Sequence, residues 1–367
     1  MKIAMIGHKD FPSRAGGIEV VVYELATRLV KRGWEVTVYN RERRRGENHG
    51  YVAGVEIYRC ATPKNQNLNA LIYSITATFK ALTKRYDLIH YHALGPSVMI
   101  LLARLFGQKT VATVHGLDWQ RSKWNRLASL YLKFGEWVIA RYAHEIIVLT
   151  PNEQRYFLAT YGRETNLVQN AVTPITPYEP QQICAEYGID RNEYVLYLGR
   201  LVPEKGVHLL IEAFLRCDTD KKLVIAGQVP DDDYGRSLWA LAGGSDRIIF
   251  TGFVSGRMLG ELYGNCALYV LPSDVEGMAL TLLEAMSAGA RCLTSDIPEN
   301  TAVLRDFGYT FKSGDRESLY ENLSAALAEN GENPRRQEQR EYIAKSYHYN
   351  AVVEKTEIVY NKALSRK

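Results

Sequence analysis

The sequence is poor in cysteine and has no long hydrophobic run. Its five cysteines are scattered and include no Cys-x-x-Cys pair, which argues against both a disulfide framework and a zinc site with the usual ligand spacing. The longest apolar runs, such as residues 98–102, are far too short to span a bilayer. We therefore expect buried free thiols in a reducing, cytoplasmic protein without a transmembrane segment.

Several motifs of known chemistry are also missing. The first strand-to-helix turn carries no Gly-x-Gly-x-x-Gly, and the chain contains neither a P-loop nor a Ser-His-Asp series in a known order. Met1 and Lys2 lead directly into a short apolar segment instead of a longer signal-peptide core, so we expect no secretory signal. Dinucleotide binding, P-loop chemistry and serine hydrolysis are therefore not indicated.

Charge of the two signs is unevenly divided along the chain. The formal net charge is +4, but residues 1–173 hold 24 Lys and Arg against 13 Asp and Glu, whereas the remainder holds 21 against 28. The first part is therefore +11 and the second −7. Chance combined with surface solvation is the alternative explanation. A basic surface suits nucleic acid or an anionic membrane, and because no nucleic-acid motif is present we expect no nucleic-acid partner.

At 367 residues the chain is long enough for two domains, each with its own core. Short apolar runs alternate with longer amphipathic ones, which predicts parallel sheets covered on both faces by helices. Pro174, Pro177 and Pro180 interrupt this rhythm, which restarts afterwards. We predict an α/β protein with two Rossmann-like, doubly wound domains, residues 1–173 and 174–345, and a cleft between them. Residues 346–367 are expected to form a helix that packs back on the first domain.

The pattern also locates individual elements. Strands are predicted over residues 2–6, 35–39, 55–58, 88–91, 110–114, 145–149, 194–198, 222–226, 247–250, 268–271 and 291–294. Helices are predicted over residues 19–31, 70–84, 97–106, 124–142, 207–216, 280–288, 334–346 and 350–364. In open parallel sheets ligands bind beyond the carboxyl ends of the strands, so the loops that follow these strands are where chemistry is expected.

The strongest motif follows the predicted strand of residues 268–271. Glu276 and Gly277 lie in the loop, and a helical pattern begins near Leu280. Gly277 lets the backbone pass close to a ligand, and the free amides and positive dipole end of the helix favour a phosphate. Glu284, about a turn and a half into the helix, can reach a hydroxylated group such as a ribose. The alternative is an ordinary helix N-terminus with two solvated glutamates, and this segment alone does not decide between them.

A second motif follows the predicted strand of residues 194–198. Gly199 and Arg200 come directly after the strand, and Lys205 and Gly206 precede the next helical pattern. A guanidinium and an ammonium group at one strand end suit a diphosphate. The alternative is a turn that carries two surface cations.

Other candidate sites are weaker. Asp231, Asp232 and Asp233 fit a metal-binding Asp-x-Asp, but a solvated acidic loop explains them better. His90 and His92 have strand spacing without a third ligand nearby, so we expect them to pack at a strand end. We therefore predict no metal site and no cofactor.

Together the two motifs resemble those of the retaining glycosyltransferases of the GT-B fold, and of family 4 in particular. The family's pair of glutamates separated by seven residues is matched by Glu276 and Glu284. Its Gly-Arg…Lys-Gly motif is matched by residues 199–200 and 205–206, and shorter similar pieces extend the resemblance over nearly the whole chain. Residues 7–19 further resemble a rhamnosyltransferase-like subset of this family.

The resemblance implies a role for each of these residues. Arg200 and Lys205 would hold the donor's diphosphate, Glu276 the hydroxyls of the transferred sugar, and Glu284 the ribose. His115, from the first domain, would reach the donor sugar and complete the catalytic set. The other residues expected at the donor are Gly16, Gly17, Asn170, Val254, Gly277, Met278, Ala279 and Leu280. Gly16 and Gly17 would let a second helix N-terminus approach the diphosphate.

We therefore interpret the chain as a retaining, metal-independent hexosyltransferase that uses a UDP-, GDP- or dTDP-sugar and acts in bacterial surface polysaccharide synthesis. The basic first domain suits a lipid-linked glycan acceptor and peripheral contact with the inner face of the plasma membrane. Leu130, Phe134 and Trp137 stand beside basic residues and would contribute to that contact, unless they pack in the core. The alternatives are a sugar-nucleotide epimerase or hydrolase on the same fold, and a non-catalytic nucleotide-sugar-binding partner.

Overall fold

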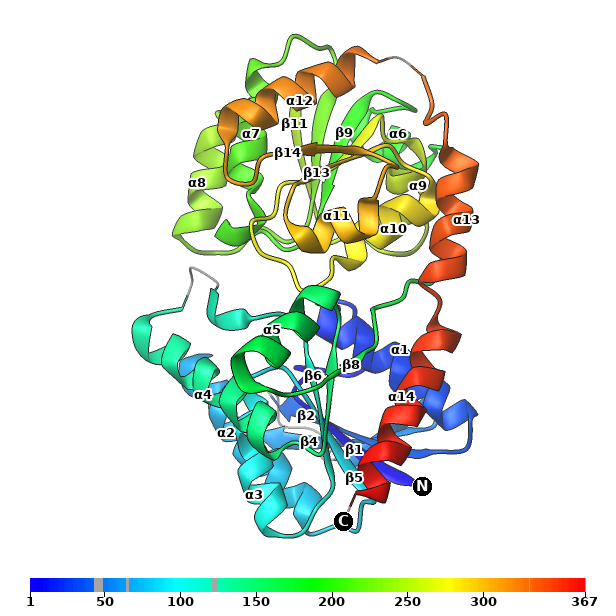
Figure 1. Ribbon diagram of the computed structural model, residues 1–367. Helices are drawn as coiled ribbons and strands as arrows, with labels where there is room; N and C mark the ends of the chain where they lie inside the picture. The colour runs from blue at the N-terminus through cyan, green and yellow to red at the C-terminus, as the bar shows by residue number, and fades with distance from the viewer. Residues whose placement is uncertain (43–48, 64–65, 121–123, 330, 367) are drawn as a thin grey trace. The chain divides into compact units, whose positions relative to one another are not determined.

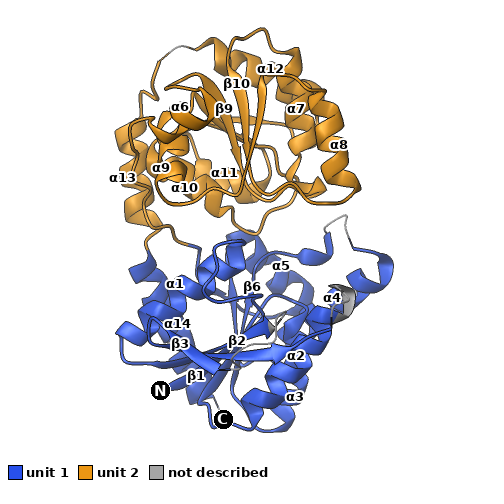
Figure 2. Cartoon of the chain, turned by 180° about the vertical axis from the view of Figure 1, so that it is seen from behind, with its two compact units in different colours: residues 1–170, 349–367 blue, residues 171–348 orange. Residues whose placement is uncertain are grey.

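The chain forms two compact units in a computed structural model that describes residues 1–42, 49–63, 66–120, 124–329 and 331–366. Unit 1 comprises residues 1–170 and 349–367, and unit 2 comprises residues 171–348 (Figure 2). The first division lies three residues before the predicted boundary at residue 173, and the second lies three residues after residue 345. Counted by unit, the sequence holds 28 Lys and Arg against 15 Asp and Glu in unit 1, and 17 against 26 in unit 2. The charge contrast is therefore +13 against −9.

Unit 1 is built on an eight-stranded sheet with the order β3-β4-β2-β1-β5-β6-β7-β8. Its strands are β1 (Lys2–Ile6), β2 (Glu35–Glu42), β3 (His49–Val52), β4 (Val55–Ala61), β5 (Leu88–His92), β6 (Thr110–Val114), β7 (Glu145–Val148) and β8 (Asn166–Leu167). Its helices are α1 (Gly17–Lys31), α2 (Gln66–Leu82), η1 (Pro96–Met99), α3 (Ile100–Leu105), η2 (Asp118–Gln120), α4 (Arg126–Tyr142), α5 (Pro151–Tyr161) and α14 (Tyr349–Ser365) (Figure 1).

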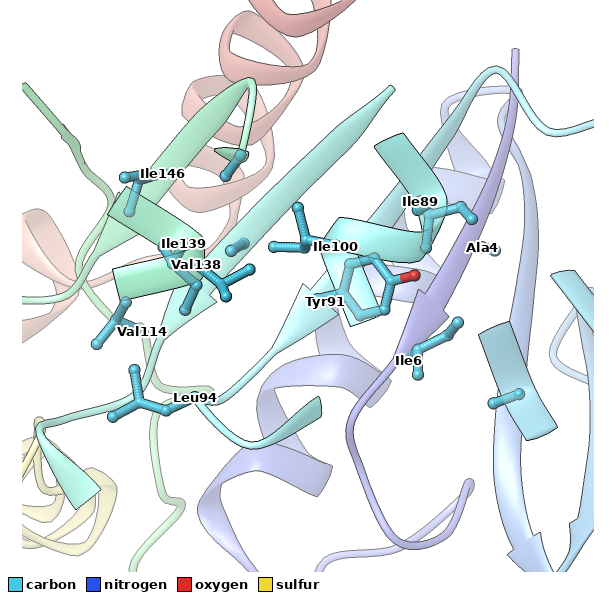
Figure 3. Close-up of a cluster of buried hydrophobic side chains, with 14 of the residues drawn as sticks. Ala4, Ile6, Ile89, Tyr91, Leu94, Ile100, Val114, Val138, Ile139 and Ile146 are labelled. Carbon is cyan, nitrogen blue, oxygen red and sulfur yellow. The ribbon is translucent and has the colours of Figure 1, made fainter. Parts of the chain in front are cut away.

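The strands of this sheet are apolar on both faces because helices cover both. On β1, Ala4 and Ile6 belong to a cluster with residues of α3 and α4, whereas Ile3 and Met5 belong to a second cluster with residues of α1 and α14. Figure 3 shows the first cluster, in which Tyr91 lies among aliphatic side chains of the sheet and of neighbouring helices. This arrangement confirms the predicted parallel, two-sided packing.

Two further features of unit 1 lie at the edge of its sheet and at the end of the chain. β3 pairs antiparallel with β4 at the edge of the sheet, after the basic run from Arg41 to Arg45. Residues 43–48, which include the last three residues of this run, lie outside the described part. The last helix, α14, packs against α1 and β7. Buried Glu145 of β7 forms ion pairs with Lys362 (3.2 Å) and Arg366 (2.6 Å), which attach the end of the chain to unit 1.

Unit 2 is built on a six-stranded sheet with the order β11-β10-β9-β12-β13-β14, and all of its strand pairs are parallel. Its strands are β9 (Tyr194–Leu198), β10 (Lys222–Ala226), β11 (Ile248–Gly252), β12 (Leu268–Leu271), β13 (Cys292–Ser295) and β14 (Tyr309–Phe311). Its helices are α6 (Gln182–Tyr187), η3 (Pro203–Lys205), α7 (Val207–Arg216), α8 (Asp233–Ala242), α9 (Gly256–Asn265), α10 (Leu280–Ala288), α11 (Pro298–Leu304), α12 (Arg316–Ala328) and α13 (Arg336–Ser346).

The core of unit 2 follows the same logic as that of unit 1. Side chains of β9, β10 and β12 pack with α7, α8 and α12 in one cluster. Because the strands are parallel, the loops after β9, β10, β11 and β12 all leave from one edge of the sheet. Among the described residues, no helix of either unit is both long enough and apolar enough to cross a membrane.

Candidate active site

The two strongest sequence motifs meet at the carboxyl edge of the unit 2 sheet. Gly206 has φ +65°, and a Cβ placed on it would lie 2.1 Å from the carbonyl oxygen of Pro272, which directly follows β12. The amide of Asp274 also donates to the carbonyl of Glu204 at 3.0 Å. Glycine is therefore required at position 206, both by its backbone conformation and by this close approach.

The contact brings Lys205 and Glu276 together as an ion pair. Lys205 Nζ donates to Glu276 Oε1, and the two side chains are 15% and 8% exposed. A pair this shielded from solvent is held in a definite geometry, unlike most surface pairs. The structure thus joins two residues that are 71 positions apart in the sequence and that the motifs assign to one site.

The N-terminus of α10 lies beside this pair. Ala279 is its N-cap residue, and no side chain of the described residues caps the helix there. Gly277, Met278 and Ala279 are buried, and Leu280 opens the helix. Amides at the first turn of a helix without a side-chain cap are available to an anionic ligand, which the helix dipole also favours.

Glu284 lies in the second turn of α10 and is held by a tyrosine that sequence reasoning did not identify. The buried Tyr263 hydroxyl donates to Glu284 Oε2 at 3.0 Å, and burial raises the pKa of Tyr263 well above its usual range. Tyr269 of β12 donates in the same way to Thr281 Oγ1 at 2.9 Å. Tyr269 offered a signal as a tyrosine in an otherwise aliphatic strand, but Tyr263 lies on α9 (Gly256–Asn265), and neither tyrosine's partner could be read from the sequence.

Arg200 and Val254 lie at the same edge of the sheet. Arg200 is exposed just after β9, and its carbonyl accepts a hydrogen bond from the buried Tyr197 hydroxyl at 2.8 Å. Val254 follows β11 and is half-buried beside the exposed Phe253. Both residues follow strands that end at the edge where the site is predicted. No described contact joins them to the Lys205–Glu276 pair.

In unit 1, His115 lies at the carboxyl end of β6 and contacts a second histidine. His92 Nδ1 at the end of β5 is 3.1 Å from His115 Nε2. Burial lowers the pKa of His115 to about 4 and that of His92 well below its usual value, so both rings are neutral at pH 7. Asn170, also predicted at the donor, is buried at the end of the first segment of unit 1.

The glycine pair at the start of α1 has a local partner. Gly16 is the N-cap residue in an extended conformation, and a Cβ on it would lie 2.3 Å from Glu19 Oε2. Glu19 Oε1 accepts a hydrogen bond from the Lys9 amide at 3.0 Å, so the carboxylate ties the loop before α1 to the helix N-terminus. Gly17 is exposed in the first turn. The close approach of Glu19 is therefore a structural reason for glycine at position 16, independent of the predicted approach to the donor.

The residues of the weaker metal candidates form hydrogen bonds and an ion pair with other side chains and with the backbone. Asp232 is the N-cap of α8 and accepts from the Gly235 amide at 2.9 Å, and Asp233 pairs with Arg236. The expected acidic loop is thus a capped helix start. His90 contacts Tyr360 and Thr113, both at 2.7 Å. Within the described parts of the chain, no group of three His, Cys, Asp or Glu residues is arranged to hold a metal ion.

A buried carboxylate in unit 1 was also not anticipated. Glu136 of α4 accepts from the Trp119 indole at 2.7 Å and from the hydroxyls of Tyr156 (2.7 Å) and Tyr161 (2.6 Å). Trp119 lies on the loop that follows His115, so this network anchors that loop to α4 and α5. Four residues far apart in the sequence form it, which explains why no sequence pattern indicated it.

Comparison with known proteins decides the family. Residues 15–174 match the model for Glycosyltransferase Family 4, and residues 181–346 match the model for glycosyl transferases group 1. The chain belongs to this glycosyltransferase family. It is 24% identical over 348 residues to the O-antigen chain mannosyltransferase C of Escherichia coli, and the match covers 88% of each chain.

Solved structures show the same fold for this glycosyltransferase. Sucrose-phosphate synthase from Thermosynechococcus elongatus superposes with a TM-score of 0.86 at 20% identity, covering 98% of both chains. HepE from Anabaena, solved with UDP-glucose, gives a TM-score of 0.79 at 17% identity and covers 98% of this chain and all of its own. The two parallel α/β units are therefore those of a GT-B glycosyltransferase, as predicted.

Proposed function

We propose that this glycosyltransferase is a retaining enzyme that moves a sugar from a nucleotide-sugar to a glycan acceptor. The single observation that carries the donor half of the proposal is the Lys205–Glu276 ion pair beside the α10 N-terminus. An ammonium group and helix amides are the groups that stabilise negative charge on a departing diphosphate. Glu276 then accepts from hydroxyls of the transferred sugar, and Glu284 from the ribose.

The proposed reaction breaks the bond between the anomeric carbon and the diphosphate oxygen. The acceptor hydroxyl forms the new bond from the same face, and an oxygen of the leaving diphosphate takes the hydroxyl proton. Arg200 and Lys205 supply the positive charge that a divalent metal supplies in other transferases, which supports metal-independent transfer. The donor class is a UDP-, GDP- or dTDP-sugar, and the HepE structure with UDP-glucose supports a nucleoside diphosphate leaving group.

A thermal-shift screen of nucleotide-sugars tests the donor. The matching donor should raise the melting temperature by mass action, and its free nucleoside diphosphate should do so to a lesser extent. Donor turnover is then measured with and without a glycan acceptor. Turnover that requires the acceptor supports transfer, equal turnover without it supports an epimerase or hydrolase, and binding without turnover supports a non-catalytic partner.

We further propose that the acceptor is lipid-linked, that the enzyme acts in bacterial surface polysaccharide synthesis, and that unit 1 contacts the cytoplasmic face of the plasma membrane. Leu130, Phe134 and Trp137 are 65%, 43% and 42% exposed, so the core-packing alternative is wrong. They follow one another along α4 at helical spacing, with the Phe134 and Trp137 rings stacked at 5.7 Å. An exposed apolar stripe is a contact surface, and its basic neighbours suit anionic lipid.

The basic residues beside this stripe are Arg126, Lys133 and Arg141, all exposed on α4. Arg121 and Lys123, which precede α4 in the sequence and would add to this basic surface, lie outside the described residues. Flotation with vesicles that contain anionic lipid tests the contact. Capture at low salt should be lost at high salt and weakened by Phe134→Ser with Trp137→Ser, whereas exposed Trp239→Ser of unit 2 should leave it unchanged. No capture at low salt would indicate a soluble acceptor.

A further inference from the structure

The His92–His115 contact is a specific hydrogen bond between two buried rings. β5 and β6 are parallel neighbours in which His92 pairs with Thr113, so both histidines lie where the strands end. The ring centroids are 5.3 Å apart with an interplanar angle of 31°. At 3.1 Å, one nitrogen must carry a proton and the other must offer a lone pair. The contact therefore fixes the tautomers of both rings together.

The surroundings indicate which ring donates. His92 Nε2 is buried and has no hydrogen-bond partner in the described structure. If His115 donated to His92 Nδ1, this buried Nε2 would be an unpaired N–H, whereas the opposite arrangement leaves it as an unpaired lone pair. Among buried backbone groups, unpaired N–H donors are rarer than under-satisfied acceptors, and we apply the same preference here. His92 then donates from Nδ1, and His115 carries its own proton on Nδ1.

We propose that His92 is a positioning residue that fixes the orientation and tautomer of His115, so that His115 presents Nδ1–H as a neutral hydrogen-bond donor to an oxygen of the bound sugar-nucleotide. The proposal rests on the proposed function, because the family resemblance assigns His115 to the donor that this function requires. Within the described chain, the hydrogen bond from His92 uses Nε2 of His115. Nδ1 is therefore the polar atom of the His115 ring that remains for a ligand. The partner of one ring nitrogen commonly decides which nitrogen of a histidine is available for chemistry.

His90 provides a matched control on the same strand. Its ring is also fully buried and lies tilted against that of His92, with the ring centroids 4.1 Å apart, but its nitrogens contact Tyr360 and Thr113 instead of His115. Replacement of His90 should therefore disturb packing to a similar degree without changing the hydrogen bond to His115. His92→Asn is the conservative variant, because an asparagine amide can place an N–H close to the position of Nδ1.

Nitrogen-15 spectra of histidine-labelled full-length protein test the proposal without any ligand. At pH 7.5, His115 should show a protonated Nδ1 and an unprotonated Nε2 in the wild type, in H92N and in H90A. In H92A the ring should exchange between tautomers. A His115 ring that is protonated at Nε2 in the wild type, or that keeps one tautomer in H92A, would overturn the proposal.

Transfer kinetics on the same variants separate this inference from the proposed function. H92A should lower kcat about tenfold, equivalent to the net loss of roughly one hydrogen bond, and H92N should restore most of it. Melting curves identify any variant that fails to fold. The tautomer of His115 in the wild-type spectrum tests the proposal even if a variant does not fold. If the tautomer responds as expected but H115A transfers sugar normally, positioning by His92 stands and the role of His115 in transfer fails.

Discussion

The two units place different kinds of polar group at equivalent edges of their sheets. Unit 2, at −9, has an ion pair where β9 and β12 end, between the largely buried Lys205 and Glu276. Unit 1, at +13, has buried and neutral histidines where β1, β5 and β6 end: His8, His92 and His115. The same topology thus provides a charged edge in one unit and an uncharged hydrogen-bonding edge in the other.

The two units avoid the cost of burying charge in different ways. A charged group removed from water without a partner is very costly, so unit 2 keeps its charges paired and partly hydrated. The histidines of unit 1 avoid the same cost by staying neutral, and burial lowers their pKa values. Charge suits a diphosphate, whereas neutral donors and acceptors suit sugar hydroxyls. The comparison also predicts that the two units respond differently to acid, to substitution and to metal removal.

The largest expected effect is acid unfolding of unit 1. Burial is the leading cause that lowers the pKa values of five histidines of unit 1: to about 4 for His8, His115 and His144, to about 3 for His90, and well below the usual value for His92. The unfolded chain binds these protons near pH 6.5, so unfolding takes up protons. The stability that unit 1 gains from keeping these histidines neutral is fully present above about pH 6.5 and is lost as the pH falls toward 4.

The magnitude is large because each pKa unit corresponds to about 1.4 kcal/mol, and a domain is stable by only about 5–15 kcal/mol. Hydrogen exchange at pH 7.5, 5.5 and 4.5 measures the effect separately for each unit. Protection of β1, β5 and β6 should fall before that of β9 and β12, since in unit 2 the pKa of one histidine, His208, is lowered. Earlier loss of protection in unit 2 would contradict the comparison.

The next largest effect is on catalysis in unit 2. Lys205→Ala should lower transfer on the order of 10²-fold or more, because it removes a strong electrostatic donor to the leaving diphosphate. Lys312→Ala is the matched control, since that lysine is exposed in the same unit and pairs with Asp315. Steady-state kinetics and melting curves on both variants provide the measurement. Near-normal transfer by a folded Lys205→Ala enzyme would remove this lysine from the mechanism.

The charged edge was largely predictable from sequence, whereas of the neutral edge only His115 was predicted as a site residue, through the family resemblance. Lys205 and Glu276 lie in contiguous motifs in which glycines and a helix start are adjacent in the chain, so local rules identify them. The strand and helix pattern was also recovered for most of both sheets, because parallel strands with both faces covered are short apolar runs. Local chemistry therefore identified the two motifs that meet in unit 2 and predicted the fold class.

The remaining contacts join residues that no local rule connects. Tyr263 reaches Glu284 across 21 positions, and His92 reaches His115 across 23, because separate elements pack together. His92 was expected to have a packing role, but its hydrogen bond to a predicted catalytic residue was not foreseen. The antiparallel β3 was missed for a related reason, since a short edge strand has a weak apolar pattern.

A smaller effect is expected where a tyrosine supports the charged edge. Tyr263→Phe removes the hydroxyl that donates to Glu284 Oε2, and a hydrogen bond of this kind contributes about 1 kcal/mol net. The KM for the donor should therefore rise about five- to tenfold, with little change in kcat. Tyr194→Phe is the control, because its buried hydroxyl contacts the carbonyl of Leu262 at 2.8 Å instead of a predicted donor residue. Equal KM values for the two variants would indicate that Glu284 needs no support from Tyr263.

The smallest expected effect concerns the aspartates of unit 2 that fit an Asp-x-Asp motif. Asp231 and Asp233 are exposed, and Asp233 pairs with Arg236 at 2.6 Å. Asp231→Ala with Asp233→Ala should leave transfer unchanged, and transfer should persist in excess EDTA, because Arg200 and Lys205 provide the positive charge at the proposed diphosphate site. Asp232→Ala should instead lower the melting temperature, since loss of an N-cap costs about 1 kcal/mol. Complete inhibition by EDTA that Mg²⁺ reverses would show that the charged edge of unit 2 needs a metal to work.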